Sequence, residues 1–309
     1  MTQKIWTGLT EQGNDPLALR WHDKVEAYKE TSSPGVCLFG FPSDLGIRNA
    51  KGRSGSTKGP EFIRKSLANV AWHFNDDQKI YDAGNLTCEW FDLKKAQQDL
   101  GNALAHFMRK NHTIMVLGGG HEMAYSNFIA LSKTQPKNSR LGIINFSSFL
   151  GMNQLDKITS LNPFSQIAEY CAENDREFNY LCLGVNKQYN TQSVFNHAQK
   201  HQAQYIFDTK MRWLHIKQLE AIIKSFMHNI DALYISFDLS VLPAYVAPGV
   251  SFPNSYGVQL DIIEHLIDTI KTSVGDKLKI SGIAEYSPTY DQDKHTAQIA
   301  SRLINLIIK

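Results

Sequence analysis

The feature that most constrains the fold of this chain is a regular alternation of short apolar runs with longer amphipathic segments. The runs in which successive residues are apolar, and which we expect to be strands, are 36–41, 80–84, 113–117, 141–146, 180–185, 204–207, 233–237 and 279–284. Successive apolar residues are typical of strands that are covered on both faces. The segments between the runs, which we expect to be helices, are 60–70, 93–110, 122–131, 164–171, 193–200, 214–228, 260–271 and 296–308. This order predicts an α/β protein with a parallel sheet of about eight strands and helices on both faces.

The composition and charge of the chain exclude several other classes of protein. The 309 residues are 42% hydrophobic and 20% charged, which is typical of a globular chain. No repeat, low-complexity tract or long linker interrupts the alternation, so residues 1–309 are expected to form a single domain. A formal net charge of +2 argues against a nucleic-acid partner. No apolar run approaches the roughly 20 residues that cross a bilayer, and no signal peptide is evident, so we expect no membrane partner and a cytoplasmic location.

The four cysteines are expected to be free thiols. Cys37, Cys88, Cys171 and Cys182 are far apart in the chain and form no Cys-x-x-Cys pair. Cys37 and Cys182 lie inside apolar runs, where a thiol behaves as a small hydrophobic group. The spacing therefore favours buried thiols over a zinc site or a disulfide framework.

Residues whose side chains can bind a metal or transfer a proton follow three of the expected strands. Ligands of parallel α/β sheets bind at the carboxyl ends of the strands. Gly118–Glu122, with the sequence GGGHE, follows the run 113–117, and a glycine turn beside the His121 imidazole suits metal binding or proton transfer. It suits equally well a plain helix start with His121 hydrogen-bonded in the core. Asp238 and Glu285 each end a buried run, where a carboxylate needs a partner, a ligand or solvent.

A basic loop and several scattered histidines are weaker candidates. Arg48 and Arg53 lie in the loop after the first run and suit a substrate carboxylate, although a solvated cationic loop is an equal alternative. The histidines that fall on or beside the expected helices are expected to be mostly solvent-facing; they are His106, His112, His197, His201 and His228.

Taken together, the motifs of the chain resemble those of the ureohydrolase family of arginases and agmatinases, and within it most closely the formimidoylglutamases. The resemblance covers nearly the whole chain. It is carried by Trp6, Ala18–His22, Gly40–Asp44, Gly52–Gly55, Lys58–Pro60, Leu67–Asn69, Gly118–Glu122, Pro163–Ile167, Ala247–Ser251 and Ala284–Tyr290. Each motif is weak alone, but their combination and order are specific.

The resemblance implies a three-layer arginase-like fold, a homo-oligomer, and two Mn²⁺ ions at the strand ends that activate a hydroxide. It implies that this hydroxide attacks a guanidinium or formimidoyl carbon. His121 corresponds to the first metal ligand of the family and Asp238 to the first residue of a late Asp-x-Asp pair. Glu285 corresponds to the acid that contacts the cationic group of the substrate.

The chain departs from this family at four of the six implied ligand positions. An Asp-x-His-x-Asp run is implied after residues 141–146, but Ser147, Phe149 and Gly151 occupy its three ligand positions. The second residue of the late pair is Ser240. Two +2 ions roughly 4 Å apart repel by about 16 kcal/mol at an effective dielectric near 20. The single aspartate that remains, Asp238, gives little compensation for that repulsion.

The sequence therefore predicts a formimidoylglutamase-like protein that has lost the binuclear manganese site and its hydrolytic activity. No catalytic residue set is intact and no cofactor is expected, beyond at most one weakly bound divalent ion at His121 and Asp238. A small zwitterionic ligand suits Arg48, Arg53 and Glu285. Two alternatives remain: an active hydrolase of formimidoylglutamate or another amidino compound that uses one metal or displaced ligands, and a regulatory or assembly subunit.

Overall fold

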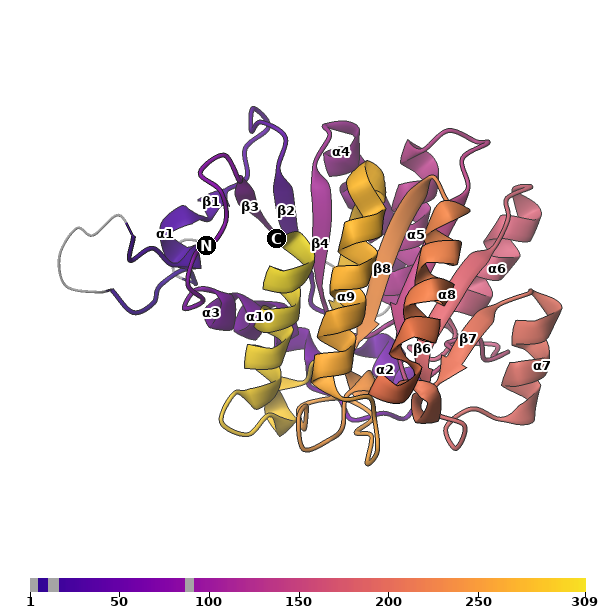
Figure 1. The fold of residues 1–309 in the computed structure, drawn as a ribbon. Helices are drawn as coiled ribbons and strands as arrows, with labels where there is room; N and C mark the ends of the chain where they lie inside the picture. Colours follow the sequence, from indigo (N-terminus) through magenta and orange to yellow (C-terminus); the bar gives the residue numbers. More distant parts are fainter. Residues whose placement is uncertain (1–4, 11–16, 87–91) are drawn as a thin grey trace.

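The strands of the chain form one parallel sheet, as the alternation predicts (Figure 1). A computed structural model describes residues 5–10, 17–86 and 92–309. The order of the strands across the sheet is β1-β3-β2-β4-β9-β8-β5-β6-β7. Their bounds are β1 Glu26–Ala27, β2 Val36–Phe41, β3 Ile80–Asn85, β4 Thr113–Gly118, β5 Leu141–Phe146, β6 Asn179–Val185, β7 Gln204–Phe207, β8 Ala232–Asp238 and β9 Leu278–Ala284. All eight strands expected from the sequence are confirmed, and β1 is added at one edge.

Helices cover both faces of this sheet, so the molecule has three layers (Figure 1). The helices are α1 Trp21–Lys24, α2 Leu45–Asn49, α3 Gly59–Leu67, α4 Leu93–Arg109, α5 Met123–Thr134, α6 Pro163–Glu173, α7 Gln192–Lys200, α8 Ile216–His228, α9 Leu260–Val274 and α10 His295–Ile308. One buried cluster joins α3, α8, α9 and α10 to one face of the sheet, and a second joins α4, α5, α6 and α7 to the other. Each face of the sheet is therefore sealed by apolar side chains, which explains why its strands are apolar at successive positions.

The elements that the sequence did not predict are short. The helices α1 and α2 and the strand β1 contain four, five and two residues, so they are too brief for a periodic pattern to reveal. Short 3₁₀ helices lie in the loops at Ser56–Lys58, Asp208–Lys210, Trp213–His215, Leu239–Val241, Gly275–Lys277 and Pro288–Tyr290.

The cysteine prediction is confirmed for the three described thiols, but the histidine prediction is wrong for two side chains. Cys37, Cys171 and Cys182 are free and buried, whereas Cys88 lies outside the described residues. His112 and His197 are buried rather than solvent-facing. The His112 ring packs against aromatic side chains, and the His197 ring hydrogen-bonds Ser165. Hydropathy alone does not reveal such partners.

In the described part of the chain, no helix has the length and apolar character needed to span a membrane.

Candidate active site at the strand ends

The four central strands carry the candidate residues. β4, β9, β8 and β5 are adjacent in that order, and because they are parallel their carboxyl ends lie together at one end of the sheet. His121 comes three residues after β4, Glu285 follows β9, Asp238 ends β8 and Ser147 follows β5. The sheet order therefore brings together residues that are far apart in the sequence, at the edge where parallel sheets bind ligands.

His121 lies in a closed polar environment. Its side chain is only 2% exposed, and its Nε2 lies 2.8 Å from the Ser236 hydroxyl. Its Nδ1 is 3.9 Å from Asp238 Oδ2, and its ring contacts the Phe164 ring edge to face. Burial lowers the pKa of His121, and the charge of Asp238 opposes that shift. The imidazole is therefore held largely neutral, the form that binds a metal or accepts a proton.

Asp238 has both of its carboxylate oxygens engaged by the chain. The Ser147 hydroxyl donates to Oδ2 at 2.8 Å, and the Ser240 backbone N–H donates to Oδ1 at 2.8 Å. Ser147 Oγ in turn accepts a hydrogen bond from the backbone N–H of Phe149 at 3.0 Å. A hydroxyl that donates to the neighbouring carboxylate thus stands where the family resemblance implies a second carboxylate.

Glu285 is held in an unusual backbone conformation. Its φ is +70°, the left-handed region that costs a side-chain-bearing residue about 1–2 kcal/mol. Its Oε1 accepts the His121 backbone N–H at 2.7 Å. Oε2 has no well-aligned hydrogen-bond partner among the described residues, although the Ser251 hydroxyl is near enough to oppose the shift in its pKa. Burial and the charge of Asp238 raise the pKa of Glu285 well above its ordinary value, so this carboxyl favours its neutral form.

Two further residues of this site were not singled out from the sequence. Glu122 is fully buried, and its Oε1 accepts the Gly46 backbone N–H at 3.0 Å. Burial, with a smaller contribution from the charge of Asp44, raises the pKa of Glu122 to about 7. Ser236, the partner of His121, lies two residues before Asp238 on β8. That spacing places the Ser236 and Asp238 side chains on the same face of the strand, so period-two counting back from Asp238 could have identified Ser236.

The other three substituted positions supply no charged ligand. Phe149 stacks on Tyr189 at 5.4 Å and meets the edge of Phe252 at 5.4 Å. Gly151 has a φ of +63°, and a Cβ there would lie 2.6 Å from Phe164 Cδ2. Ser240 is buried, and its hydroxyl has no partner among the described residues.

The two arginines that were predicted to share one basic loop are engaged by the chain itself, but only Arg53 lies in a loop, because Arg48 belongs to α2. Arg48 pairs with Asp44 at 3.0 Å, and its side chain is half exposed. The Arg53 guanidinium donates to the carbonyls of Pro248 and Val250 and lies 4.1 Å over the Tyr290 ring. Arg53 also lines a cavity of about 450 Å³. The loop therefore places Arg53 at a ligand-sized space, whereas Arg48 lies on the surface.

The donor atoms at this site form no compact set of charged ligands. His121 and Asp238 lie 3.9 Å apart, and Glu285 accepts a hydrogen bond from the backbone N–H of His121. Within the residues that the structure describes, no group of three or more His, Cys, Asp or Glu side chains has the geometry of a metal site. As arranged, the site can accept hydrogen bonds at Glu285 and offer hydroxyls from serines.

Comparison with known proteins agrees with this fold and these motifs. The sequence profile of the Arginase family matches residues 34–308. Formimidoylglutamase of Chromobacterium violaceum is 41% identical over 300 residues, which cover 97% of this chain and 96% of that protein. Formimidoylglutamase of Aeromonas hydrophila is 40% identical over 308 residues, covering 99% and 97% of the two chains.

Solved structures show the same fold at lower identity. The formimidoylglutamase structure from Bacillus subtilis superposes with a TM-score of 0.84 at 19% identity, covering 97% of this chain and 95% of the other. The Trypanosoma cruzi formiminoglutamase, whose crystal structure contains Mn²⁺, has a TM-score of 0.78 at 20% identity, with coverages of 89% and 92%. The fold, the strand-end motifs and these full-length similarities lead to one conclusion: this chain belongs to the Arginase family.

Proposed function

We propose that this chain is a formimidoylglutamase-type member of the Arginase family that binds a small amidine- or guanidine-bearing amino acid derivative without a binuclear manganese centre. The observation that carries the proposal is the hydrogen bonding of Asp238. Both of its oxygens accept hydrogen bonds from neighbouring protein groups, one of them the hydroxyl of Ser147. A neutral hydroxyl is a poor ligand for a hard divalent ion unless it ionises.

The side chains at the other substituted positions do not suit two Mn²⁺ ions. Phe149 is committed to a stack with Tyr189 and supplies no donor atom. Gly151 has no room for a carboxylate without a shift of Phe164. The residues present therefore do not fit the binuclear centre that the family resemblance implies.

The binding part of the proposal rests on Glu285 and Arg53. Glu285 Oε2 is buried and lacks a well-aligned partner, so it can accept a hydrogen bond from a ligand N–H, and a ligand cation there would favour its ionised form. Arg53 borders a cavity and can meet a ligand carboxylate. The proposed ligand is a small zwitterion, with its cation at Glu285 and its carboxylate at Arg53.

Metal analysis of the unmodified protein tests the proposal. After incubation with excess Mn²⁺ and removal of free ion, we expect far less than one tightly bound ion per chain, and no hydrolysis of formimidoylglutamate. Close to two bound ions per chain, together with turnover, would refute the proposal.

A second candidate is favoured by the names of the relatives. Full-length similarity of about 40% to proteins named formimidoylglutamase supports a metal-dependent hydrolase that uses one ion or displaced ligands. This candidate predicts activity that a chelator abolishes and Mn²⁺ restores. It also predicts loss of that activity in His121→Ala, whereas the surface variant Lys187→Gln keeps it.

A reconstruction variant separates loss of ligands from wider divergence of the loops. Ser147→Asp, Phe149→His and Ser240→Asp together return three donors, and we expect this triple variant to bind more Mn²⁺ than the unmodified protein. Adding Gly151→Asp is expected to give no further gain, because its backbone conformation and Phe164 oppose a side chain there. Unchanged metal binding in the triple variant would show that changes beyond the ligands prevent the site from forming.

A further inference from the structure

His112 is buried near the amino end of β4, and its ring has no hydrogen-bond partner among the described residues. The side chain is 4% exposed, and both Nδ1 and Nε2 are unpaired. The nearby Gly35 carbonyl accepts the Thr113 backbone N–H instead, at 3.0 Å. Most buried polar side-chain atoms in native structures are hydrogen-bonded, so two unpaired ring nitrogens require an explanation.

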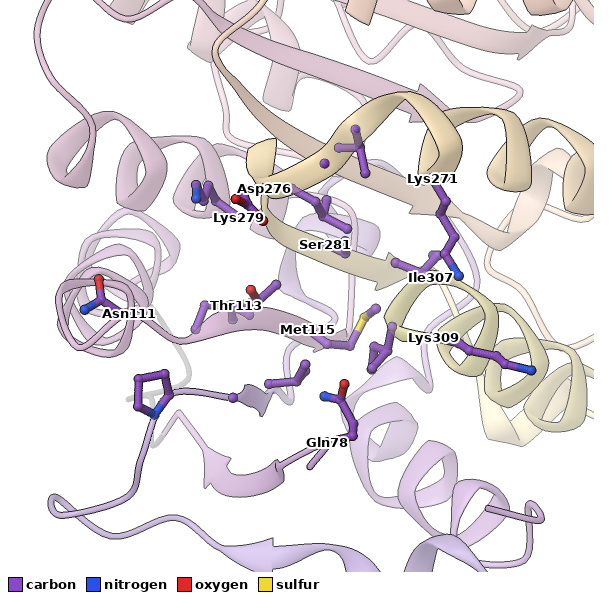
Figure 2. Close-up of a pocket in the computed structure, with 18 residues that line it drawn as sticks. Gln78, Asn111, Thr113, Met115, Lys271, Asp276, Lys279, Ser281, Ile307 and Lys309 are labelled. Carbon is purple, nitrogen blue, oxygen red and sulfur yellow. The ribbon is translucent and has the colours of Figure 1, made fainter. Parts of the chain in front are cut away.

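The neighbours of His112 in the chain show which face of the sheet its ring lies on. Figure 2 shows Asn111 and Thr113, which flank His112 where α4 leads into β4. Thr113 and Met115 line a cavity of about 700 Å³ at the amino ends of the strands. Because successive side chains alternate between faces, His112 points away from this cavity, toward the face that α4 covers.

The side chain that covers His112 belongs to a surface segment, residues 26–35, which we call the strap. The strap begins with β1, which has two residues and pairs with β3 at the edge of the sheet. The Tyr28 ring of the strap lies 5.5 Å from the His112 ring, and the Tyr81 ring of β3 lies 5.7 Å from it. Phe107 of α4 lies 4.9 Å from Tyr28. Tyr28 therefore anchors the strap on the helix layer, directly against the His112 ring.

The other side-chain contacts of the strap are more exposed. Glu30 pairs with Lys110 and, at 3.2 Å, with His106, and its side chain is 67% exposed. Exposed ion pairs of this kind contribute little to stability. The Ser33 hydroxyl lies 3.0 Å from the Tyr81 hydroxyl. Closure of the strap therefore depends chiefly on the packing of Tyr28 and on the state of the ring beneath it.

The surroundings of His112 contain no charge that would balance a proton on its ring. Within the part of the chain that the structure describes, no carboxylate lies within 4.0 Å of its nitrogens. Lys110 is the charged group that acts on the ring, and Glu30 is paired with Lys110. Tyr28 and Cys37 lie on the same face, and burial raises the pKa of each, so both stay neutral near pH 7.

These surroundings favour the neutral form of the ring. Burial lowers the pKa of His112, the charge of Lys110 lowers it further, and the Gly35 carbonyl opposes both effects. A protonated ring would carry a charge and a second N–H donor, for which the described residues supply neither a counter-charge nor an acceptor. Water would hydrate both once the Tyr28 ring moved away.

We propose that the strap is a pH-sensitive element that opens locally when His112 takes up a proton. Because the pKa of His112 is lower under the closed strap than in water, closure is fully favoured above about pH 6.5 and is progressively lost as the pH falls below that value. The strap lies at the amino ends of β2 and β4, so this inference does not rest on the function proposed for the strand-end site.

Hydrogen exchange of the full chain, followed by mass spectrometry, tests the proposal. The Tyr28 backbone N–H donates to the Asp82 carbonyl at 3.0 Å, so peptides that contain Tyr28 report opening of the strap. Protection factors are corrected with the exchange of the unfolded chain at each pH. Between pH 7.5 and 5.5 we expect the Tyr28 protection factor to fall up to about tenfold, because only the open form binds a proton at the ordinary pKa of about 6.5. Peptides from β8 and α9 are expected to change less than about twofold.

Variants separate His112 from the other titratable groups of the strap. His112→Phe keeps an aromatic ring beneath Tyr28 and removes the titration, so its protection factor should change less than about twofold over the same range. His112→Leu is a second apolar variant with the same expected result. His106→Gln is the matched control, because it removes the exposed histidine that pairs with Glu30. It is expected to keep the tenfold fall or enlarge it, since a protonated His106 attracts Glu30 and opposes opening.

Any of three results would overturn the proposal. One is a Tyr28 protection factor that stays constant between pH 7.5 and 5.5 in the unmodified protein. Another is the same fall in the unmodified protein and in a folded His112 variant, which would assign the titration to other groups. The last is an equal fall in the β8 and α9 peptides, which would show that the whole fold loosens rather than the strap.

Discussion

At the residue scale, the strand-end site differs from the pattern that the family resemblance implies at two side chains with described partners. Ser147 stands where the resemblance implies a carboxylate. Its hydroxyl donates a hydrogen bond to Asp238, whereas a second carboxylate would repel Asp238. Phe149 replaces an implied imidazole with a ring that packs on Tyr189. Both side chains therefore have partners within the protein.

A substitution at Gly151 tests how much the stability of the loop after β5 depends on a glycine at that position. Gly151→Ala is expected to lower the free energy of unfolding by about 2–4 kcal/mol, because it adds left-handed backbone strain and an overlap with Phe164. Gly84→Ala is the matched control: its φ is +78°, but nothing lies within 4 Å of the added Cβ. It is expected to cost about 1–2 kcal/mol. Equal costs in urea unfolding would show that the Phe164 contact is easily relieved.

At the scale of elements, ion pairs at the amino ends of strands help to join neighbours in the sheet. Arg140 precedes β5 and Asp231 precedes β8, and these two strands are adjacent. The guanidinium and the backbone N–H of Arg140 both donate to the Asp231 carboxylate. These contacts lower the pKa of Asp231 from 3.8 to about 2, chiefly through the side-chain hydrogen bond.

This lowered pKa sets the direction of a pH dependence. Because the folded pKa lies below the unfolded pKa, the pair stabilises the fold above about pH 4 and loses that effect as the pH falls toward 2. Arg140→Gln is expected to lower the urea midpoint slightly near neutral pH, with the difference from the unmodified protein vanishing near pH 2. Both side chains are about half exposed, so added salt should shrink the difference. A difference that persists at the acid end would mean that Arg140 acts through packing.

At the scale of the whole molecule, a buried ion pair links the edge of the sheet to the helix layer. Arg64 of α3 is 1% exposed and donates twice to Asp82 of β3, at 2.9 and 3.0 Å. Asp82 Oδ2 also accepts the Trp6 indole N–H at 2.7 Å. One carboxylate therefore connects a strand, a helix and the segment that precedes α1.

Arg64→Ala is expected to lower the free energy of unfolding by about 3–5 kcal/mol, because it leaves the Asp82 carboxylate buried without its cation. Lys65→Ala is a matched control in the same helix. Lys65 pairs with Glu61, but its side chain is half exposed, so its removal should cost less than about 1 kcal/mol. Similar costs for the two variants in urea unfolding would contradict the role assigned to the buried pair.

Much of this architecture could be predicted because periodicity is a local property. Each main strand, such as β5 or β8, was recognised from a run of apolar residues, and a run reports burial on both faces without any knowledge of its neighbours. Short elements such as α2 carry too few residues for such a pattern. The contact partners of polar side chains were harder to predict, because those of His112 and Arg53 lie on segments that are distant in the sequence.

The sequence by itself determined the order of strands and helices and the residues that end each strand, and it shows Ser147, Phe149, Gly151 and Ser240 where the family resemblance implies metal ligands. Only the tertiary structure decided how the candidate site residues are engaged: that Asp238 accepts a hydrogen bond from Ser147, that Glu285 adopts a positive φ, and that Arg53 donates to the carbonyls of Pro248 and Val250. The physical reason is the difference in range between the interactions involved. Secondary structure follows from neighbouring residues, whereas hydrogen bonding and pKa depend on groups that only sheet order and packing bring together.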